Sequence, residues 1–175
     1  MINIVLFQPE IPQNTGNIMR TCVAFDFHLH IIGPITFSLD EKSLKRAGMD
    51  YIKSLKMTLY ENYEEYLKVN GKKLTYFITR YGSKTPDMAN FKSLTEDIYV
   101  MFGRESTGIP HEILRNNDDY LIRIPMVPNA RSLNLSNTVS IIGYEILRQQ
   151  NYFNLSTNEA LKGSNFLKKE IGDDE

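Results

Sequence analysis

The chain has 175 residues, of which 42% are hydrophobic and 23% are charged, and its formal net charge is −1. These values are typical of one ordinary globular domain and give no strong electrostatic footprint for nucleic acid. The single cysteine excludes an internal disulfide, and no apolar stretch approaches the roughly 20 residues of a membrane span. With no signal peptide expected before Ile2, these features predict a cytoplasmic protein without membrane contact.

Short apolar strands alternate with helical patterns along the chain. This alternation predicts an α/β domain with a mainly parallel sheet and helices on both faces. The expected strands are 2–7, 29–32, 56–59, 74–79, 98–102 and 120–124. The expected helices are 15–25, 41–47, 63–68, 110–115 and 136–149, with one further short helix expected between residues 155 and 167. Residues 1–150 form the predicted domain, and 151–175 a partly disordered extension whose last five residues are expected to be disordered.

Two of the expected helices carry capping signals. Asn14 or Thr15 is the predicted N-cap of the first helix, in which Ile18, Cys22 and Phe25 form an apolar face. Asn134 or Ser136 is the predicted N-cap of the last helix, which has the same apolar periodicity.

Residues 8–20 join the first strand to the first helix, where open α/β sheets bind ligands. Gly16 and Arg20 lie four residues apart on one helical face, which leaves room for a ligand to reach the guanidinium. The alternative interpretation is a proline-containing turn followed by a surface arginine.

Two later segments also contain more polar or glycine residues than a core requires. Residues 102–110 place Gly103 and Gly108 after a buried strand, where backbone N–H groups can face a ligand. The segment is neither a Walker A loop nor a dinucleotide fingerprint, and a purely structural turn is the alternative. In residues 124–137, Ser132, Asn134 and their hydroxyl and amide neighbours exceed what a helix cap needs, which suggests a hydrogen-bonded ligand site.

The remaining charged residues, the histidines and the cysteine give weaker indications of function. The best candidates for an RNA-binding cluster are Lys42, Lys45, Arg46, Lys53 and Lys56, although charge alone favours a solvated helix face. The three histidines have no partners at metal-ligand spacing, so no metal site is expected. Cys22 is interpreted as a core thiol.

Together the three segments resemble the SPOUT methyltransferases, and within them the class that methylates ribose 2′-hydroxyl groups. The resembling motifs are Asn-Thr-Gly-Asn-Ile-x-Arg at 14–20, Phe-Gly-x-Glu-x-x-Gly-x-Pro at 102–110 and Ile-Pro-Met-Val-Pro-x-x-Arg-Ser-Leu-Asn-Leu-Ser at 124–136. The likeness runs from about residue 2 to 150. It is greatest to the small enzymes that modify the tRNA wobble nucleotide, a cytidine or modified uridine at position 34.

The resemblance implies a C-terminal trefoil knot, a homodimer and an anticodon stem-loop of tRNA as partner. It implies S-adenosyl-L-methionine bound in the knot, S-adenosyl-L-homocysteine as product, and no metal. The implied cofactor-binding residues are Ile78, Thr79, Gly103, Ile124, Met126, Ser132 and Leu133. The implied catalytic residues are Asn14, Arg20, Glu105, Ser132 and Asn134.

Arg20 would stabilise the developing alkoxide or act as a base, and its high intrinsic pKa favours the first role. Asn14 and Glu105 would orient Arg20 and the loops, while Ser132 and Asn134 would hold the knot.

Two positions depart from the family pattern. Arg104 stands where proline or serine is common, and Thr79-Arg80-Tyr81-Gly82 matches the end of the family's fourth strand only loosely. Two alternative functions also stay open. One is 2′-O-methylation of ribosomal RNA, although those enzymes commonly carry an N-terminal RNA-binding domain that is not expected here. The other is a non-catalytic RNA-binding module on the same fold, against which the presence of Asn14, Arg20, Glu105 and Asn134 argues.

Overall fold

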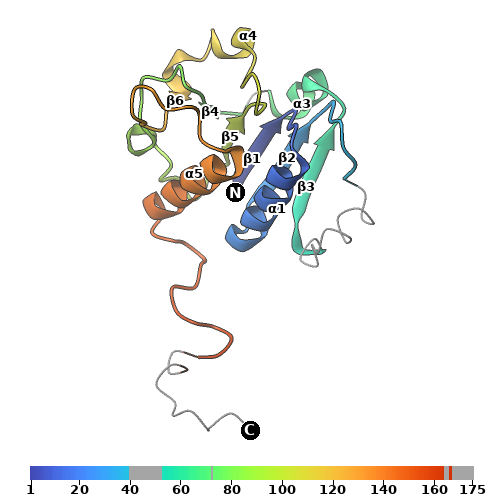
Figure 1. Cartoon of the computed structure of the whole chain (residues 1–175). Helices are drawn as coiled ribbons and strands as arrows, with labels where there is room; N and C mark the ends of the chain where they lie inside the picture. The colour runs from blue at the N-terminus through green and yellow to red at the C-terminus, as the bar shows by residue number, and fades with distance from the viewer. Residues whose placement is uncertain (40–52, 72, 164–165, 167–175) are drawn as a thin grey trace.

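Within the described part of the chain, six strands form one parallel sheet (Figure 1). The structure is a computed structural model, and it describes residues 1–39, 53–71, 73–163 and 166. The strand order is β3-β2-β1-β5-β4-β6, and each neighbouring pair is parallel. The bounds are β1 Ile2–Phe7, β2 His28–Ile32, β3 Lys56–Tyr60, β4 Thr75–Ile78, β5 Ile98–Phe102 and β6 Leu121–Ile122. The predicted α/β class with a parallel sheet is confirmed.

Helices cover both faces of this sheet. Two of them, α1 (Pro12–Phe25) and α5 (Leu135–Gln149), lie side by side on one face (Figure 1). The opposite face is covered by α3 (Tyr63–Asn70) and the short α4 (His111–Leu114). The expected helix 41–47 lies outside the described residues.

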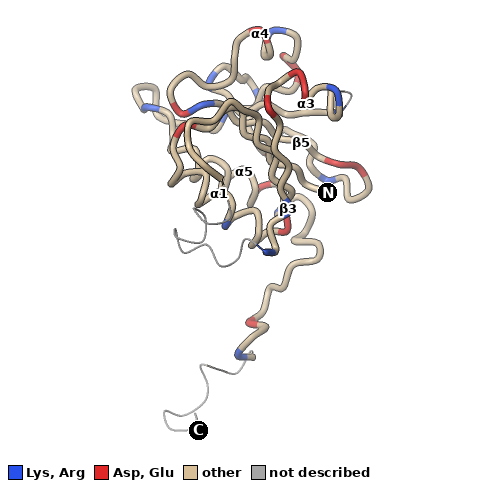
Figure 2. The backbone as a smooth tube through the Cα atoms, turned by 90° about the vertical axis from the view of Figure 1, so that its right-hand side faces the viewer, with Lys and Arg blue, Asp and Glu red and all other residues tan. Residues whose placement is uncertain are grey.

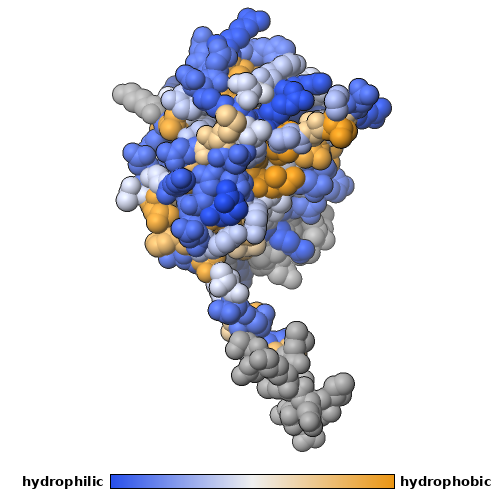
Figure 3. Space-filling view, turned by 90° about the vertical axis from the view of Figure 1, so that its left-hand side faces the viewer, coloured by the Kyte–Doolittle hydropathy of each residue, from blue (hydrophilic) through white to orange (hydrophobic). Residues whose placement is uncertain are grey.

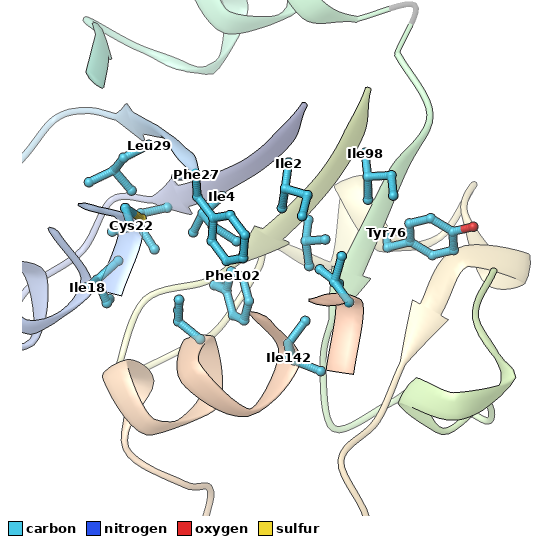
Figure 4. Packing of buried hydrophobic residues seen from close by; sticks show 14 of the residues in the cluster. Ile2, Ile4, Ile18, Cys22, Phe27, Leu29, Tyr76, Ile98, Phe102 and Ile142 are labelled. Atoms are coloured by element: carbon cyan, nitrogen blue, oxygen red, sulfur yellow. The ribbon is translucent and has the colours of Figure 1, made fainter. Parts of the chain in front are cut away.

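The alternation of side chains along each strand divides the core in two. On β1, Ile4 and Leu6 point toward α1 and α5, whereas Val5 and Phe7 point to the opposite face. Figure 4 shows the first of these cores, in which Ile18 and Cys22 of α1 and Ile142 of α5 meet strand residues such as Ile4 and Leu29. Because β1 and β5 are covered on both faces, all of their residues are buried, and all except Asn3 are hydrophobic.

The helix starts differ from the prediction in one case and agree in the other. Helix α1 begins at Pro12, and its N-cap is Ile11, whose side chain makes no capping bond, so the prediction of Asn14 or Thr15 was wrong. Proline suits the first helical position because its fixed φ is already helical. For α5 the prediction is confirmed, since Asn134 accepts the N–H groups of Ser136 and Asn137.

The segment after α5 does not form the expected further helix in its described part. Tyr152 and Leu155 still pack against the core, but the chain then leads away from the body (Figure 1). Leu161 is 97% exposed, so a helix here would have no apolar surface to bury against. The expected disorder of residues 171–175 concerns positions outside the described residues.

The trefoil knot implied by the resemblance stays a prediction. Among the described residues, no helix is long and apolar enough to cross a membrane.

Candidate active site

Three loops that follow the carboxyl ends of parallel strands meet at one edge of the sheet. Loop 8–11 follows β1, loop 103–110 follows β5, and segment 123–134 follows β6 and leads into α5. The strand order reverses between β1 and β5, because β2 and β3 lie beyond β1 and β4 and β6 lie beyond β5. Open α/β sheets bind ligands at such a switch point, so this edge is where a site is expected.

A chain of hydrogen bonds joins these three loops. Asn134 Nδ2 donates to Asn14 Oδ1 at 2.8 Å, and Asn14 Nδ2 donates to Glu105 Oε1 at 3.0 Å. The Glu105 carboxylate also accepts the backbone N–H groups of Glu10 at 2.9 Å and Ile11 at 3.2 Å. The structure therefore brings together three of the residues predicted to carry catalysis, Asn14, Glu105 and Asn134, each from a different segment of the chain.

A second carboxylate, which the sequence analysis missed, strengthens the contact between the first two loops. Glu10 Oε1 accepts the Ser106 hydroxyl and Glu10 Oε2 accepts the Ser106 N–H, both at 2.8 Å. These two bonds, the side-chain bond first, lower the pKa of Glu10. Glu10 and Glu105 thus each bind the backbone of the other's loop. The only sequence signal was an acid in each loop, because nothing local reveals partners 95 residues apart.

Arg104, which departs from the family pattern, binds the end of the neighbouring strand. Its Nη2 donates to Gln8 Oε1, and its guanidinium lies 5.7 Å from the centroid of the Phe7 ring. Gln8 has a φ of 48°, and its side-chain amide donates to the carbonyl of Gly33 at 2.9 Å. Arg104 and Gln8 therefore link the carboxyl ends of β5, β1 and β2.

A cavity of about 340 Å³ opens between the carboxyl ends of β4, β5 and β6. Every residue predicted to bind the cofactor lines it: Ile78, Thr79, Gly103, Ile124, Met126, Ser132 and Leu133. Gly103 allows a close approach within this wall, since a Cβ there would lie 2.1 Å from the backbone carbon of Gly108. The volume falls in the range of small-molecule sites, roughly 300–1,000 Å³.

The other two predicted catalytic residues lie outside the hydrogen-bonded chain. Ser132 is exposed at the cavity wall and makes no hydrogen bond with the described residues. Arg20 is exposed on α1, one turn after Gly16, and does not line the cavity. The structure therefore does not group Arg20 with the predicted cofactor-binding residues.

Charged residues of both signs lie on the described surface, and three arginines, Arg80, Arg104 and Arg123, line the cavity. Figure 2 shows lysines and arginines interspersed with acidic residues. Figure 3 shows one face that is largely hydrophilic, with smaller apolar patches. Of the predicted basic cluster, Lys53 and Lys56 are exposed, and Lys56 Nζ lies 2.6 Å from Asp26 Oδ1. The other members, Lys42, Lys45 and Arg46, lie outside the described residues.

The cysteine and the histidines have structural roles. Cys22 is buried, which raises the pKa of its thiol to about 12, and the interpretation as a core thiol is confirmed. Buried His30 bonds to the Tyr60 hydroxyl at 2.9 Å and to Asn3 Oδ1 at 3.0 Å, and its ring stacks on His28. In the part of the chain that the structure describes, no group of His, Cys, Asp or Glu is arranged to hold a metal ion.

Comparison with known proteins identifies the family to which this arrangement belongs. The model of the SpoU rRNA methylase family matches residues 1–144. The chain belongs to the SpoU methylases. The matched region contains the loops after β1, β5 and β6. The hydrogen-bonded loops and the cavity of this SpoU methylase therefore lie in the part of the chain that it shares with the family.

Two relatives whose names specify a reaction are similar to this chain over most of their length. The Escherichia coli tRNA (cytidine(34)-2′-O)-methyltransferase is 42% identical over 153 residues, which cover 87% of this chain and 96% of that protein. A Geobacillus stearothermophilus protein named for the same reaction is 46% identical over 155 residues, covering 89% of this chain and 99% of its own.

Solved structures agree with this SpoU methylase in fold. A Bacillus anthracis protein described as an RNA methyltransferase has a TM-score of 0.86 at 46% identity, with 89% of this chain and 98% of that chain covered. A structure concerned with 2-OH methylation of C/U34 on tRNA has a TM-score of 0.77 at 37% identity, covering 87% and 97%. An AdoMet-bound rRNA methyltransferase from Sinorhizobium meliloti has a TM-score of 0.74 at 25% identity, covering 89% of this chain and 57% of its own.

Proposed function

We propose that this SpoU methylase transfers a methyl group from S-adenosyl-L-methionine to the ribose 2′-hydroxyl of the tRNA wobble nucleotide, in the cytoplasm. The observation that carries the proposal is the cavity after β4, β5 and β6, bordered by the hydrogen-bonded Glu105, Asn14 and Asn134. Relatives at 42–46% identity, named for this reaction on cytidine-34, support the substrate.

The cavity residues suit the proposed cofactor. Ile78, Ile124 and Leu133 provide apolar surface for an adenine ring, and Thr79 and Ser132 provide hydroxyl groups. Because Gly103 has no side chain, its backbone lies close to the backbone of Gly108 and forms part of the cavity wall. When bound there, S-adenosyl-L-methionine supplies an activated methyl group, so this chain needs only to orient the reactants and stabilise developing charge.

The protein's part in the reaction is positioning and electrostatics. Glu105 and Asn14 hold the loops after β1 and β5 together. Helix α1 follows the first of these loops, and its Arg20 is exposed to solvent. The ribose hydroxyl gives its proton to solvent water, and the Arg20 guanidinium stabilises the developing alkoxide and the neighbouring phosphate. Because Arg20 does not line the cavity, it acts on the RNA rather than on the cofactor.

The experiment that tests the substrate is a map of ribose-methylated nucleotides in RNA from cells with and without the gene. Loss of methylation at tRNA nucleotide 34 alone is the expected result. Loss at a ribosomal RNA nucleotide, with tRNA unchanged, would replace the proposed substrate by the ribosomal alternative. Unchanged methylation in both RNAs would favour a non-catalytic module.

We further propose that the catalytic domain ends near residue 150 and acts as a homodimer. Exposed apolar side chains on α5, including Ile141 at 43% and Tyr144 at 55%, offer surface for a second copy. Light scattering at micromolar concentration is expected to give twice the chain mass of 20.2 kDa. A stable monomer under those conditions would contradict the dimer.

A further inference from the structure

Two arginines that the proposed reaction does not yet use stand at the rim of the cavity. Arg80 follows β4 and Arg123 follows β6, and both line the cavity. Strands β4 and β6 are parallel neighbours with Ile78 opposite Ile122, and Thr79 N–H bonds to the Ile122 carbonyl at 2.9 Å. The strand register therefore sets the two arginines beside each other at the carboxyl ends of the strands.

The side chain of Arg123 is held in this position. Its Nη1 donates to the backbone carbonyl of Arg80 at 2.9 Å, and its own N–H donates to the carbonyl of Lys84 at 2.8 Å. The other guanidinium donors of Arg123 have no hydrogen-bond partner in the described part of the chain. Among the described residues, the Arg80 side chain has no hydrogen-bond or ion-pair partner, and both side chains are exposed.

The charges of the described cavity wall do not balance. Besides Arg80 and Arg123, the charged residues lining it are Arg104 and Glu105. The Arg104 guanidinium is bound to Gln8 and lies over an aromatic ring, and the Glu105 carboxylate already accepts three N–H donors. Two guanidinium groups thus face the cavity rim without a carboxylate partner from the described chain.

We propose that Arg80 and Arg123 form a clamp for an oxyanion at the cavity rim. A guanidinium matches the two-oxygen geometry of carboxylates and phosphates, so it binds them with paired donors. Resting on the proposed function, two sources supply this chemistry: the carboxylate of the cofactor's amino-acid end and a phosphate of the RNA. The clamp would hold the amino-acid end of the cofactor at the cavity rim in the first case, and the RNA backbone there in the second.

The test compares Arg80→Gln and Arg123→Gln with the control Arg115→Gln, which alters an exposed arginine outside the cavity. Calorimetry measures binding of S-adenosyl-L-homocysteine and of 5′-methylthioadenosine, which lacks the carboxylate. Filter binding measures tRNA affinity at several salt concentrations. Arg80→Gln is the primary variant because the Arg80 side chain makes no contact that folding requires, and a melting curve checks each protein.

Each source of the oxyanion predicts a different result. If the carboxylate is bound, both variants weaken S-adenosyl-L-homocysteine binding by about tenfold or more and leave methylthioadenosine binding within twofold. If the phosphate is bound, both small ligands bind normally. The tRNA affinity then falls, and its salt slope decreases by about one per arginine.

The clamp is overturned if all three affinities stay within twofold of the parent, as they should for Arg115→Gln. A parent protein that binds neither S-adenosyl-L-homocysteine nor tRNA would overturn the proposed function and the clamp together. Binding by the parent with unchanged variants overturns the clamp alone.

Discussion

Asn14 lies in the middle of the hydrogen-bonded chain because its side-chain amide has both a donor and an acceptor. Its Nδ2 donates to Glu105, and its Oδ1 accepts from Asn134, so one side chain satisfies an acceptor and a donor at once. An ionised carboxylate in its place would accept but not donate, so it would reproduce only part of this pattern. At the residue scale, Asn14, Glu105 and Asn134 therefore have distinct hydrogen-bonding roles, whereas Ser132 and Arg20 are exposed and lie outside this chain of bonds.

We predict that Arg20→Ala removes methyl transfer while cofactor affinity stays nearly unchanged. Losing one preorganised charge-stabilising group costs about 2.7–4 kcal/mol in comparable sites, or roughly a hundred- to thousandfold in rate. Arg20→Lys should restore little, because a lysine keeps the charge without the planar fork. Single-turnover kinetics with saturating cofactor and tRNA measures both variants. Rates within a few-fold of the parent for Arg20→Ala would show that Arg20 is only a surface residue.

At the scale of elements, α5 connects the site to the core. Its N-cap Asn134 holds the first turn through Oδ1 and reaches Asn14 through Nδ2, so the helix start and the site share one side chain. Farther along, Val139, Ile142 and Ile146 are fully buried against the sheet. A change at Asn134 is therefore expected to affect both the stability of the helix and the geometry of the loops.

Two substitutions at Asn134 separate these effects. Asn134→Asp keeps the capping oxygen, so thermal stability should stay close to the parent. It would, however, replace the donor that binds Asn14 Oδ1 by a carboxylate oxygen, so two acceptors would face each other there and activity should fall. Asn134→Ala should lose activity and also about 1 kcal/mol of stability. Thermal melts and methyl-transfer rates test this, and full activity of Asn134→Asp would contradict a role for the bond to Asn14.

The elements show what the sequence could and could not predict. Strands β1 and β5 were predicted to the residue because both are buried on two faces and bounded by polar or turn residues. The start of α1 was placed three residues late, because the carboxylate that binds the preceding N–H groups belongs to Glu105, far along the chain. The cavity lining was predicted through the family resemblance. The Glu10–Ser106 contact and the Arg80–Arg123 pair were missed, since only the folded sheet brings these residues together.

At the scale of the whole molecule, two cores on opposite faces of one sheet determine stability. The core under α3 includes an uncommon polar group, because buried His30 lies among Asn3, Tyr60 and Tyr66. Burial first, and then the neighbouring His28, lower the pKa of His30 from 6.5 to about 4. The folded protein therefore keeps this histidine neutral under conditions in which an unfolded chain would protonate it.

This shift predicts that stability falls on acidification. Between about pH 6.5 and 4 the unfolded chain binds a proton at His30 that the folded chain does not, so the free energy of unfolding decreases as the pH decreases. Urea unfolding at several pH values measures the slope. His30→Gln, which keeps hydrogen-bonding capacity without titrating, should reduce the slope. An unchanged slope in His30→Gln would contradict the assignment.

In the proposed reaction, the ribose 2′-oxygen of tRNA nucleotide 34 accepts the methyl group. The most direct test of this reaction uses purified protein, S-adenosyl-L-methionine carrying a labelled methyl group, and two tRNAs that differ only at nucleotide 34. One carries ribose there and the other carries 2′-deoxyribose, which lacks the acceptor oxygen but leaves the base unchanged. We predict stoichiometric labelling of the first tRNA and none of the second. Equal labelling of both tRNAs would place the methyl group elsewhere and contradict methylation of the nucleotide-34 ribose.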